Sequence, residues 1–338
     1  MSGAQPDARP EAETGARPET ERPSSRWLVV GAGGMLGRDL LPLLAGTPGV
    51  SAHGLTRAQL DITDPGAVLA AVGGHDLVVN AAAWTDVDAA EADEAAATAV
   101  NGTAVRHLAA ACAATGARLL HLSTDYVLRG DGDSPYPEDA PTGPLNAYGR
   151  GKLVGEQAVT ELLPEHGYSV RTAWLYGEHG GNFVATMLKL AAQRDTLDVV
   201  DDQHGQPTWT YALAQQLLEL GLAALAGTAP AGIYHGTSSG DTTWFGLARA
   251  AYELSGLDPD RIRPTTSAAY ARPAVRPGYS VLGHERWAAA GMKPLPHWRD
   301  SLAEALRGPG FTALTSSAVL TGPAAHTGSA AHTETGAG

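Results

Sequence analysis

The stretch Trp27-Leu-Val-Val30-Gly31-Ala-Gly-Gly-Met-Leu-Gly37 decides the fold of this 338-residue chain. Four apolar residues, then spaced glycines and an amphipathic run from Arg38, predict a strand, a tight turn and a helix. Gly31 permits the turn, Gly34 lets backbone N–H groups approach a pyrophosphate, and Gly37 lets helix and strand pack closely. The stretch indicates a dinucleotide site, with a glycine-rich turn of no ligand consequence as the alternative.

The same alternation continues along the chain. VSAHGL, DLVVNAA and RLLHLST each precede a stretch rich in alanine and leucine, and SVRTAWLYG follows later. Strands joined by crossover helices form a parallel, doubly wound sheet, so the predicted class is α/β. We expect a Rossmann domain over residues 26–178, mainly a substrate-binding lobe over 179–306, and disordered tails at 1–25 and 307–338, where large apolar residues are scarce.

The composition indicates which partners are disfavoured and in which compartment the protein is expected. The formal net charge of -13 disfavours a nucleic acid or an anionic membrane as partner, because both need a basic surface. The single cysteine, Cys112, lies in a predicted helix and permits no intrachain disulfide. Residues 1–25 lack the apolar core of a secretory signal, and no run is long enough to span a bilayer. A soluble, cytoplasmic protein is expected.

The end of the second predicted strand bears on the choice of dinucleotide. A carboxylate there would bind the adenosine ribose of NAD, whereas an arginine would accept the extra phosphate of NADP. The residue is Arg57, which favours NADPH and leaves NADH possible. Arg57 could equally be a solvated surface residue, and the following Asp61 and Ile62 could flank the adenine or form only a turn.

Tyr148 and Lys152 are candidate catalytic residues. They are four residues apart in NAYGRGKLVGEQAV, which reads as a helix despite Gly149 and Gly151, so both lie on one face. An ammonium beside a phenol favours the phenolate, so this pair could pass a proton near neutral pH. Tyr-x-x-x-Lys is common by chance, but Ser123-Thr124-Asp125 at a strand end upstream strengthens it by supplying a hydroxyl for a carbonyl. A helix-cap role competes for Ser123 more than for Thr124.

At this point the chain resembles the dTDP-4-dehydrorhamnose reductase family, a branch of the extended short-chain dehydrogenases/reductases. The resemblance covers about residues 27–305 and rests on linked motifs, among them GAGGMLG, LDITDP, VVNAAAWTDVDAAE, HLSTDYV, NAYGRGKLVGE, RTAWLYG, DDQHGQPT and RPGYSVL. It implies an NAD(P)H-dependent reduction of the C4 ketone of a dTDP-4-dehydro-6-deoxy-L-hexose in deoxysugar biosynthesis, by a monomer or homodimer.

The resemblance also implies roles for individual residues. Thr124 would orient the carbonyl, Tyr148 would donate the proton, and Lys152 would lower the pKa of Tyr148 and bind the ribose. The implied cofactor contacts, which include Tyr148 and Lys152, are Gly31, Gly34, Met35, Leu36, Gly37, Arg57, Asp61, Ile62, Asn80, Ala81, Ala82 and Ala83. The implied substrate contacts are Thr85, Val87, Thr124, Asp125, Trp174, Arg276 and Ser280. From chemistry alone, Trp174 is either an apolar plate for the sugar or part of the core.

Some positions depart from the family pattern. Asp39 and Tyr211 replace glutamates that hold a divalent ion in certain members, so we expect no metal here. Trp84 and Tyr279 replace the usual residues near the substrate, so the sugar could differ. Two alternatives stay open: a reductase for another sugar nucleotide, such as dTDP-dihydrostreptose synthase, and a non-catalytic, dinucleotide-binding regulatory subunit. The intact Thr124, Tyr148 and Lys152 count against the second.

Overall fold

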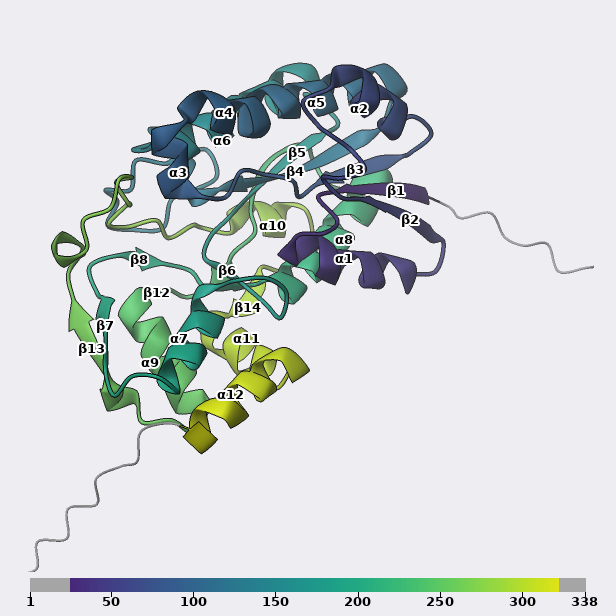
Figure 1. Cartoon of the computed structure of the whole chain (residues 1–338). Helices are drawn as coiled ribbons and strands as arrows, with labels where there is room; N and C mark the ends of the chain where they lie inside the picture. Colours follow the sequence, from purple (N-terminus) through teal and green to yellow (C-terminus); the bar gives the residue numbers. More distant parts are fainter. Residues whose placement is uncertain (1–24, 322–338) are drawn as a thin grey trace, which may run out of the picture.

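The computed structural model describes residues 25–321, which form two lobes (Figure 1). The expectation of disorder is wrong for Ser25, which is buried and begins the first strand; for residues 1–24 and 322–338 it lies outside the described residues. Within residues 25–321, no helix combines the length and apolar character needed to cross a bilayer.

The first lobe is built on a six-stranded sheet in which every neighbouring pair is parallel. The strand order is β10-β5-β4-β3-β1-β2. The order of the strands reverses between β1 and β3, because β2 lies on one side of β1 and β3 on the other, and ligands of such folds bind at the carboxyl ends of the strands. The doubly wound α/β prediction is confirmed. The strands are β1 (Ser25–Val30), β2 (Val50–Leu55), β3 (Leu77–Asn80), β4 (Arg118–Thr124), β5 (Gly167–Thr172) and β10 (Gly232–His235).

Helices cover both faces of this sheet, as the nearly continuous apolar strands require. Trp27 and Val29 of β1 pack with α1 (Met35–Ala45) and α8 (Thr210–Leu225). Leu28 and Val30 face the opposite layer. That layer contains α2 (Pro65–Val72), α5 (Ala104–Thr115) and α6 (Ala147–Leu162), with α3 (Val87–Ala92) and α4 (Glu94–Thr98) beside them (Figure 1). Cys112 is buried in α5, within the expected helix.

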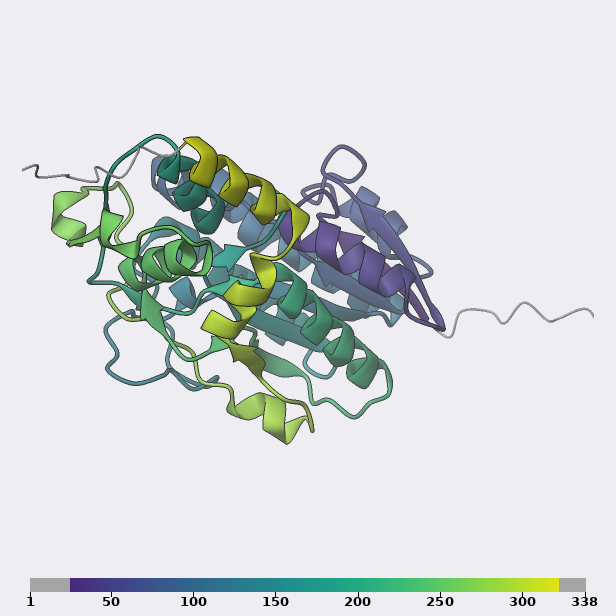
Figure 2. The ribbon, with the colours of Figure 1, turned by 90° about the horizontal axis from the view of Figure 1, so that it is seen from below.

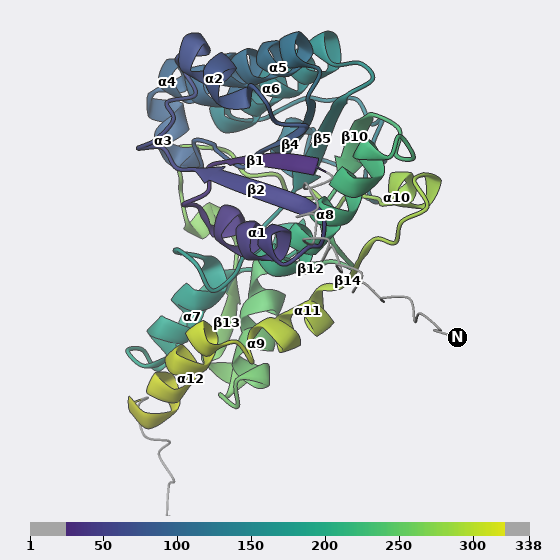
Figure 3. The ribbon, with the colours of Figure 1, turned by 90° about the vertical axis from the view of Figure 1, so that its right-hand side faces the viewer.

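The second lobe lies below the carboxyl edge of the sheet in the view of Figure 3. Its helices are α7 (Phe183–Ala191), α9 (Trp244–Leu254), α11 (Trp298–Ala305) and α12 (Pro309–Thr321). Short paired strands frame them: β7 (Leu197–Val200) with β13 (Ile262–Thr265), β8 (His204–Gly205) with β12 (Thr242–Thr243), β6 (Leu175–Tyr176) with β9 (Thr208–Trp209), and β11 (Ser238–Ser239) with β14 (Leu295–His297). Three elements that lie among these in the sequence pack with the first lobe instead: α8, β10 and α10 (Glu285–Ala289).

The expectation that the chain is disordered from residue 307 is wrong for residues 309–321. These residues form α12, which lies along α7 (Figures 1 and 2). Phe311 is 1% exposed and packs with Leu302 and Leu306, and Ala318 is buried in a neighbouring cluster. Counting large apolar residues missed this helix because the buried side chains described in it are one phenylalanine and one alanine.

Candidate active site

The turn after β1 has the geometry that its glycines predict. Gly31 has φ +84°, and a Cβ on it would lie 2.6 Å from the backbone N of Ala82. A Cβ on Gly37 would lie 2.6 Å from the carbonyl oxygen of Gly31. These two glycines therefore let the turn, the start of α1 and the end of β3 pack directly against one another.

This corner is suited to a dinucleotide phosphate. Gly34 is the N-cap of α1 and no side chain caps the first turn, so the N–H groups of Met35 and Leu36 lie at an uncapped helix N-terminus. Asn80 ends β3, is fully buried, and accepts a hydrogen bond from Ala82 N at 3.1 Å. That bond orders the loop Ala81–Ala83, whose small side chains leave room above the strand ends.

The residues expected around the adenosine lie past the end of β2. Arg57 is exposed, which leaves its guanidinium accessible to a phosphate. Asp61 is also exposed, and its Oδ1 accepts from the Thr63 backbone N at 2.9 Å and from the Thr63 hydroxyl at 2.7 Å. These bonds from Thr63 lower the pKa of Asp61. Ile62 is buried among the α2 and α5 residues, so it contributes to the core as well as to any adenine pocket.

Thr124, Tyr148 and Lys152 come together at the carboxyl end of β4. Thr124 ends the strand, and Tyr148 and Lys152 lie one turn apart on α6, which packs against β4. The Thr124 hydroxyl has a lowering effect on the pKa of Tyr148, and it donates a hydrogen bond to Asp125 Oδ1 at 2.9 Å. Lys152 is 2% exposed, and its Nζ donates to the Leu122 carbonyl at 2.6 Å.

Burial dominates the pKa values of this group. Burial and then the Asp125 carboxylate raise the pKa of Tyr148 to about 12, so the expected lowering by Lys152 is not found. Burial lowers the pKa of Lys152 to about 8, against an opposing effect of Glu156. A phenol with this pKa is fully protonated at neutral pH, and the lysine is still mostly charged.

The glycines of α6 explain how a helix forms there. A Cβ on Gly149 would lie 2.3 Å from the Tyr126 carbonyl oxygen, and one on Gly155 would lie 2.4 Å from the Asn101 carbonyl oxygen. The helix therefore packs backbone to backbone against its neighbours, which offsets the low helix propensity of glycine.

The expectation that Ser123 rather than Thr124 would cap the turn after β4 is wrong. The Thr124 hydroxyl accepts from Tyr126 N at 3.2 Å, while the buried Ser123 hydroxyl has no hydrogen-bond partner within residues 25–321.

The expected substrate residues Asp125 and Ser280 also meet. Asp125 is 3% exposed; burial raises its pKa to about 6, and the nearby hydroxyls of Ser280 and Thr124 oppose the rise. Ser280 reaches the site from a loop of the second lobe, far along the chain. Thr85 is exposed on the loop that leads into α3, and the half-buried Val87 is the first residue of α3.

Trp174 belongs to an aromatic group in the second lobe. The centroid of its ring lies 3.6 Å from that of Trp244, and the two rings are nearly parallel. The ring of Phe183 packs on Trp244 in turn, with centroids 4.7 Å apart. Among residues 25–321, Trp174 is the one non-glycine residue with positive φ, at 46°. The Trp244 stack, together with Gly205, whose Cβ would lie 2.6 Å from the Trp174 ring, accommodates this unusual backbone.

A cavity of about 620 Å³ opens beside these rings. Phe183 and Trp244 line it, together with Tyr126 of the first lobe. A loop that contains Arg272, Val275 and Arg276 also lines it. The cavity therefore combines aromatic faces with two guanidinium groups, which is suitable for a nucleoside diphosphate.

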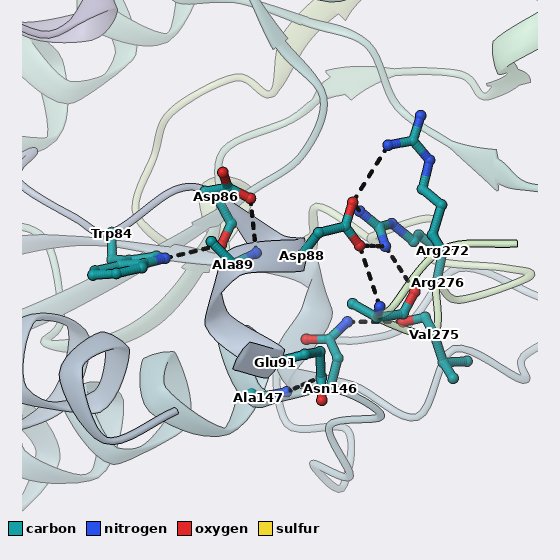
Figure 4. Close-up of polar contacts among 11 residues, drawn as sticks. Trp84, Asp86, Asp88, Ala89, Glu91, Asn146, Ala147, Arg272, Val275 and Arg276 are labelled. Carbon is teal, nitrogen blue, oxygen red and sulfur yellow. Dashed lines mark hydrogen bonds and ion pairs between the residues drawn. The ribbon is translucent and has the colours of Figure 1, made fainter. Parts of the chain in front are cut away.

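Arg276 is held by a residue that the sequence reasoning did not single out. Asp88 of α3 forms a two-pronged ion pair with it, in which Arg276 Nη2 donates at 2.8 Å and Nη1 makes the second bond (Figure 4). The Arg272 Nη1 donates to the same carboxylate at 3.3 Å.

Asn101 is a second residue that the sequence did not single out. Its side-chain amide binds the backbone of Trp84, accepting from the Trp84 N at 2.9 Å and donating to the Trp84 O at 3.0 Å. Its π-helical setting, Ala99–Thr103, is frequent at functional sites but has no clear sequence signal.

The departures from the family pattern lie at different distances from the site. Trp84 packs with Tyr148 against the alanines of α3, α4 and α6, so it adjoins the catalytic group. Tyr279 lies beside Ser280 and stacks on His204 with ring centroids 6.3 Å apart. Asp39 accepts a hydrogen bond of 2.5 Å from Thr210, and Tyr211 packs against Trp209.

The chain is similar to reductases of dTDP-sugars over nearly its whole described length. The family model for the RmlD substrate binding domain matches residues 25–308. A protein of Streptomyces griseus named dTDP-4-dehydrorhamnose reductase is 61% identical over 285 residues, which cover 84% of this chain and 93% of that protein. A dTDP-4-keto-6-deoxy-D-glucose reductase of Streptomyces niveus is 52% identical, over 83% of this chain and 96% of its own length.

A solved structure adds a cofactor to the comparison. The dTDP-4-dehydrorhamnose reductase of Bacillus anthracis in complex with NADP has a TM-score of 0.78 and 32% sequence identity. The alignment covers 84% of this chain and 99% of that one. Both the matched family model and the high identity over most of each chain agree with the motifs. The chain is therefore a member of the dTDP-4-dehydrorhamnose reductase family.

Proposed function

We propose that this protein is an NADPH-dependent oxidoreductase that reduces the C4 ketone of a dTDP-4-dehydro-6-deoxy-L-hexose in deoxysugar biosynthesis. The observation that carries the proposal is the meeting of Tyr148, Thr124 and Lys152 at the carboxyl end of β4. An uncapped helix N-terminus lies in the same sheet edge, at the end of β1. This is where a doubly wound fold brings a dinucleotide and its substrate together.

The glycine turn fits NADPH. Gly31 and Gly37 leave no side chain in the corner, and Gly34, Met35 and Leu36 would direct backbone N–H groups at the pyrophosphate. Arg57 would contact the phosphate on the adenosine ribose, beside Asp61 and Ile62. Asn80 and the small residues Ala81, Ala82 and Ala83 would lie beneath the nicotinamide ribose. NADPH supplies the hydride for C4.

Residues of this chain would donate the proton and orient the carbonyl oxygen. Tyr148 would donate its phenolic proton to the C4 oxygen, which becomes a hydroxyl as C4 gains hydrogen. A pKa of about 12 keeps that proton in place at neutral pH until an alkoxide forms. The Thr124 hydroxyl would orient the carbonyl, and the Lys152 ammonium would bind the nicotinamide ribose. Asp125, Ser280, Thr85, Val87 and Trp174 would contact the sugar nucleotide, and Arg276 its diphosphate.

The identity of the sugar is the main alternative. The two relatives at 61% and 52% identity carry names for different 4-keto sugars. Trp84 packs beside Tyr148, so its departure from the family pattern lies where a sugar would be sensed. A different product, such as dTDP-dihydrostreptose, is therefore the second candidate.

The test is a panel of dTDP-4-keto sugars offered with NADPH or NADH. Absorbance at 340 nm follows turnover, and NMR of the product identifies the sugar and its configuration at C4. We expect turnover of dTDP-4-dehydrorhamnose with NADPH. Turnover of only another sugar would select the second candidate, and dinucleotide binding without turnover of any sugar would select a regulatory subunit.

Location and assembly follow as proposals. A cytoplasmic site of action agrees with the single, buried thiol of Cys112. We propose a monomer or homodimer, which light scattering after size-exclusion chromatography would distinguish.

A further inference from the structure

The residues 272–276, here called the 272–276 segment, form a wall of the 620 Å³ cavity. The segment belongs to the second lobe in sequence, yet its polar contacts reach the first lobe. Figure 4 shows Arg272, Val275 and Arg276 facing α3 and the start of α6. The segment therefore connects the two lobes at the cleft between them, which contains this cavity.

One carboxylate provides most of the attachment. Asp88 receives the two-pronged bond from Arg276, the 3.3 Å bond from Arg272, and a 3.2 Å bond from the backbone N of Ala274. The Arg276 side chain is 17% exposed, whereas that of Arg272 is 60% exposed. Hydrogen bonds from Arg276 lower the pKa of Asp88 to about 2, so it is charged throughout the physiological range.

The attachment is linked to the catalytic helix. Asn146, the N-cap of α6, donates from Nδ2 to the Val275 carbonyl at 2.9 Å and accepts from Gly149 N at 2.8 Å through Oδ1. Glu91, one turn after Asp88 on α3, accepts from Ala147 N at 2.7 Å. Both contacts lie within two residues of Tyr148. The 272–276 segment, α3 and the start of α6 form a single hydrogen-bonded unit (Figure 4).

Two guanidinium groups of the cavity wall share the Asp88 carboxylate. A two-pronged ion pair fixes the plane of the Arg276 guanidinium as well as its position. The remaining N–H groups are thus oriented before a ligand arrives, which reduces the entropy cost of binding.

We propose that Asp88 is a positioning residue that anchors the 272–276 segment across the cleft and orients Arg276 toward the diphosphate of the sugar nucleotide. The inference rests on the proposed function, because it names a residue that serves the same substrate site. Asp88 acts through Arg276 and touches neither the nicotinamide nor the reacting carbonyl.

The test compares Asp88→Asn with a matched control, Glu94→Gln. Asparagine keeps the shape of Asp88 and removes its charge. Glu94 forms a two-pronged ion pair with Arg150 between α4 and α6, at 2.7 Å for each bond, outside the cavity wall. We expect Asp88→Asn to raise the KM of the sugar nucleotide and the Kd of dTDP about 10- to 100-fold, the range for losing a charged hydrogen bond. The Kd of NADPH should stay within about twofold, kcat should change less than KM, and Glu94→Gln should change none of these.

A double-variant cycle shows whether Asp88 works through Arg276. Arg276→Lys keeps the charge and loses the fork, so we expect a weakening of dTDP binding similar to that of Asp88→Asn. The variant with both changes should bind dTDP no more than about twofold more weakly than either single variant. Additive losses would overturn the proposal, because they would mean independent roles.

Other outcomes separate this inference from the proposed function. Wild-type dTDP binding by Asp88→Asn would overturn the inference alone. A fall in NADPH affinity or thermal stability that matches the loss of dTDP binding would make Asp88 a general structural residue, and would also overturn it. A wild-type protein that binds dTDP but reduces no dTDP-4-keto sugar would overturn the proposed function, while the dTDP measurements would still decide the role of Asp88.

Discussion

The glycine turn at residues 31–37 and the 272–276 segment both meet phosphate groups in the proposed function, yet they are built differently. The turn uses contiguous backbone, and its conformation follows from φ and from missing Cβ atoms. The segment uses side chains that depend on Asp88 and Asn146, which are 188 and 129 residues away from their partners. A local site is therefore complete once its strand and helix form, whereas an assembled site requires both lobes.

Tyr148→Phe should have the largest effect and tests the assembled catalytic group. Removing the hydroxyl removes the proton donor, so we expect kcat to fall by about 10² to 10⁴. The Kd of NADPH, measured by fluorescence, should hardly change, because the glycine turn is intact. Tyr211→Phe is a control outside this group. Wild-type turnover by the Tyr148 variant would disprove the catalytic role.

Gly31→Ala tests the glycine turn, and it should weaken cofactor binding, which Tyr148→Phe should leave unchanged. The new Cβ would lie 2.6 Å from Ala82 N on a backbone with φ +84°, so the turn must shift. We expect the Kd of NADPH to rise about 10- to 100-fold, consistent with a few kcal/mol of strain. Gly181→Ala, where a Cβ meets open space, should bind NADPH as the wild type does. Equal affinities in the two variants would mean that the turn does not contact the cofactor.

Asp125→Asn shows the electrostatic cost of an assembled pocket. Burial raises the folded-state pKa of Asp125 to about 6, above its ordinary value of 3.8, so the folded protein favours the protonated form. As the pH rises from about 4 to 6, the wild type should lose roughly 3 kcal/mol of unfolding free energy relative to the variant. Urea unfolding at pH 5 and pH 7 should show the gap widening; a gap that does not depend on pH would contradict this.

Arg57→Ala should have the smallest effect, because one exposed side chain contributes one contact. We expect kcat/KM with NADPH to fall about tenfold and that with NADH to stay nearly constant, since only NADPH carries the extra phosphate. Steady-state kinetics with both cofactors provides the measurement. Equal losses with both would show that Arg57 does not read that phosphate.

The first lobe was predictable because its signals are local. The order of apolar runs and helices predicted the parallel sheet, and the positions of Gly31 and Gly37 predicted a turn that the structure reproduces in detail. The Tyr148 and Lys152 spacing similarly predicted a shared helix face. None of these inferences needed to know what packs against the element.

The remaining features depend on tertiary contacts that no short window of sequence contains. The raised pKa of Tyr148 comes from burial and from Asp125, so the spacing to Lys152 gave the wrong direction. Asp88 lies directly after the predicted contact Val87, but only the arrival of Arg276 shows its role. The return of α8 and β10 to the first lobe was hidden for the same reason, since their partners precede them by many residues.

The helix α12 has a practical consequence for anyone who expresses this protein. The family match ends at residue 308, and α12 begins at Pro309. A clone trimmed to the family boundary would remove Phe311 and leave Leu302 and Leu306 facing water, which invites aggregation. Expression clones and C-terminal fusions should therefore extend beyond Thr321, so that recombinant yield does not depend on an accidental truncation.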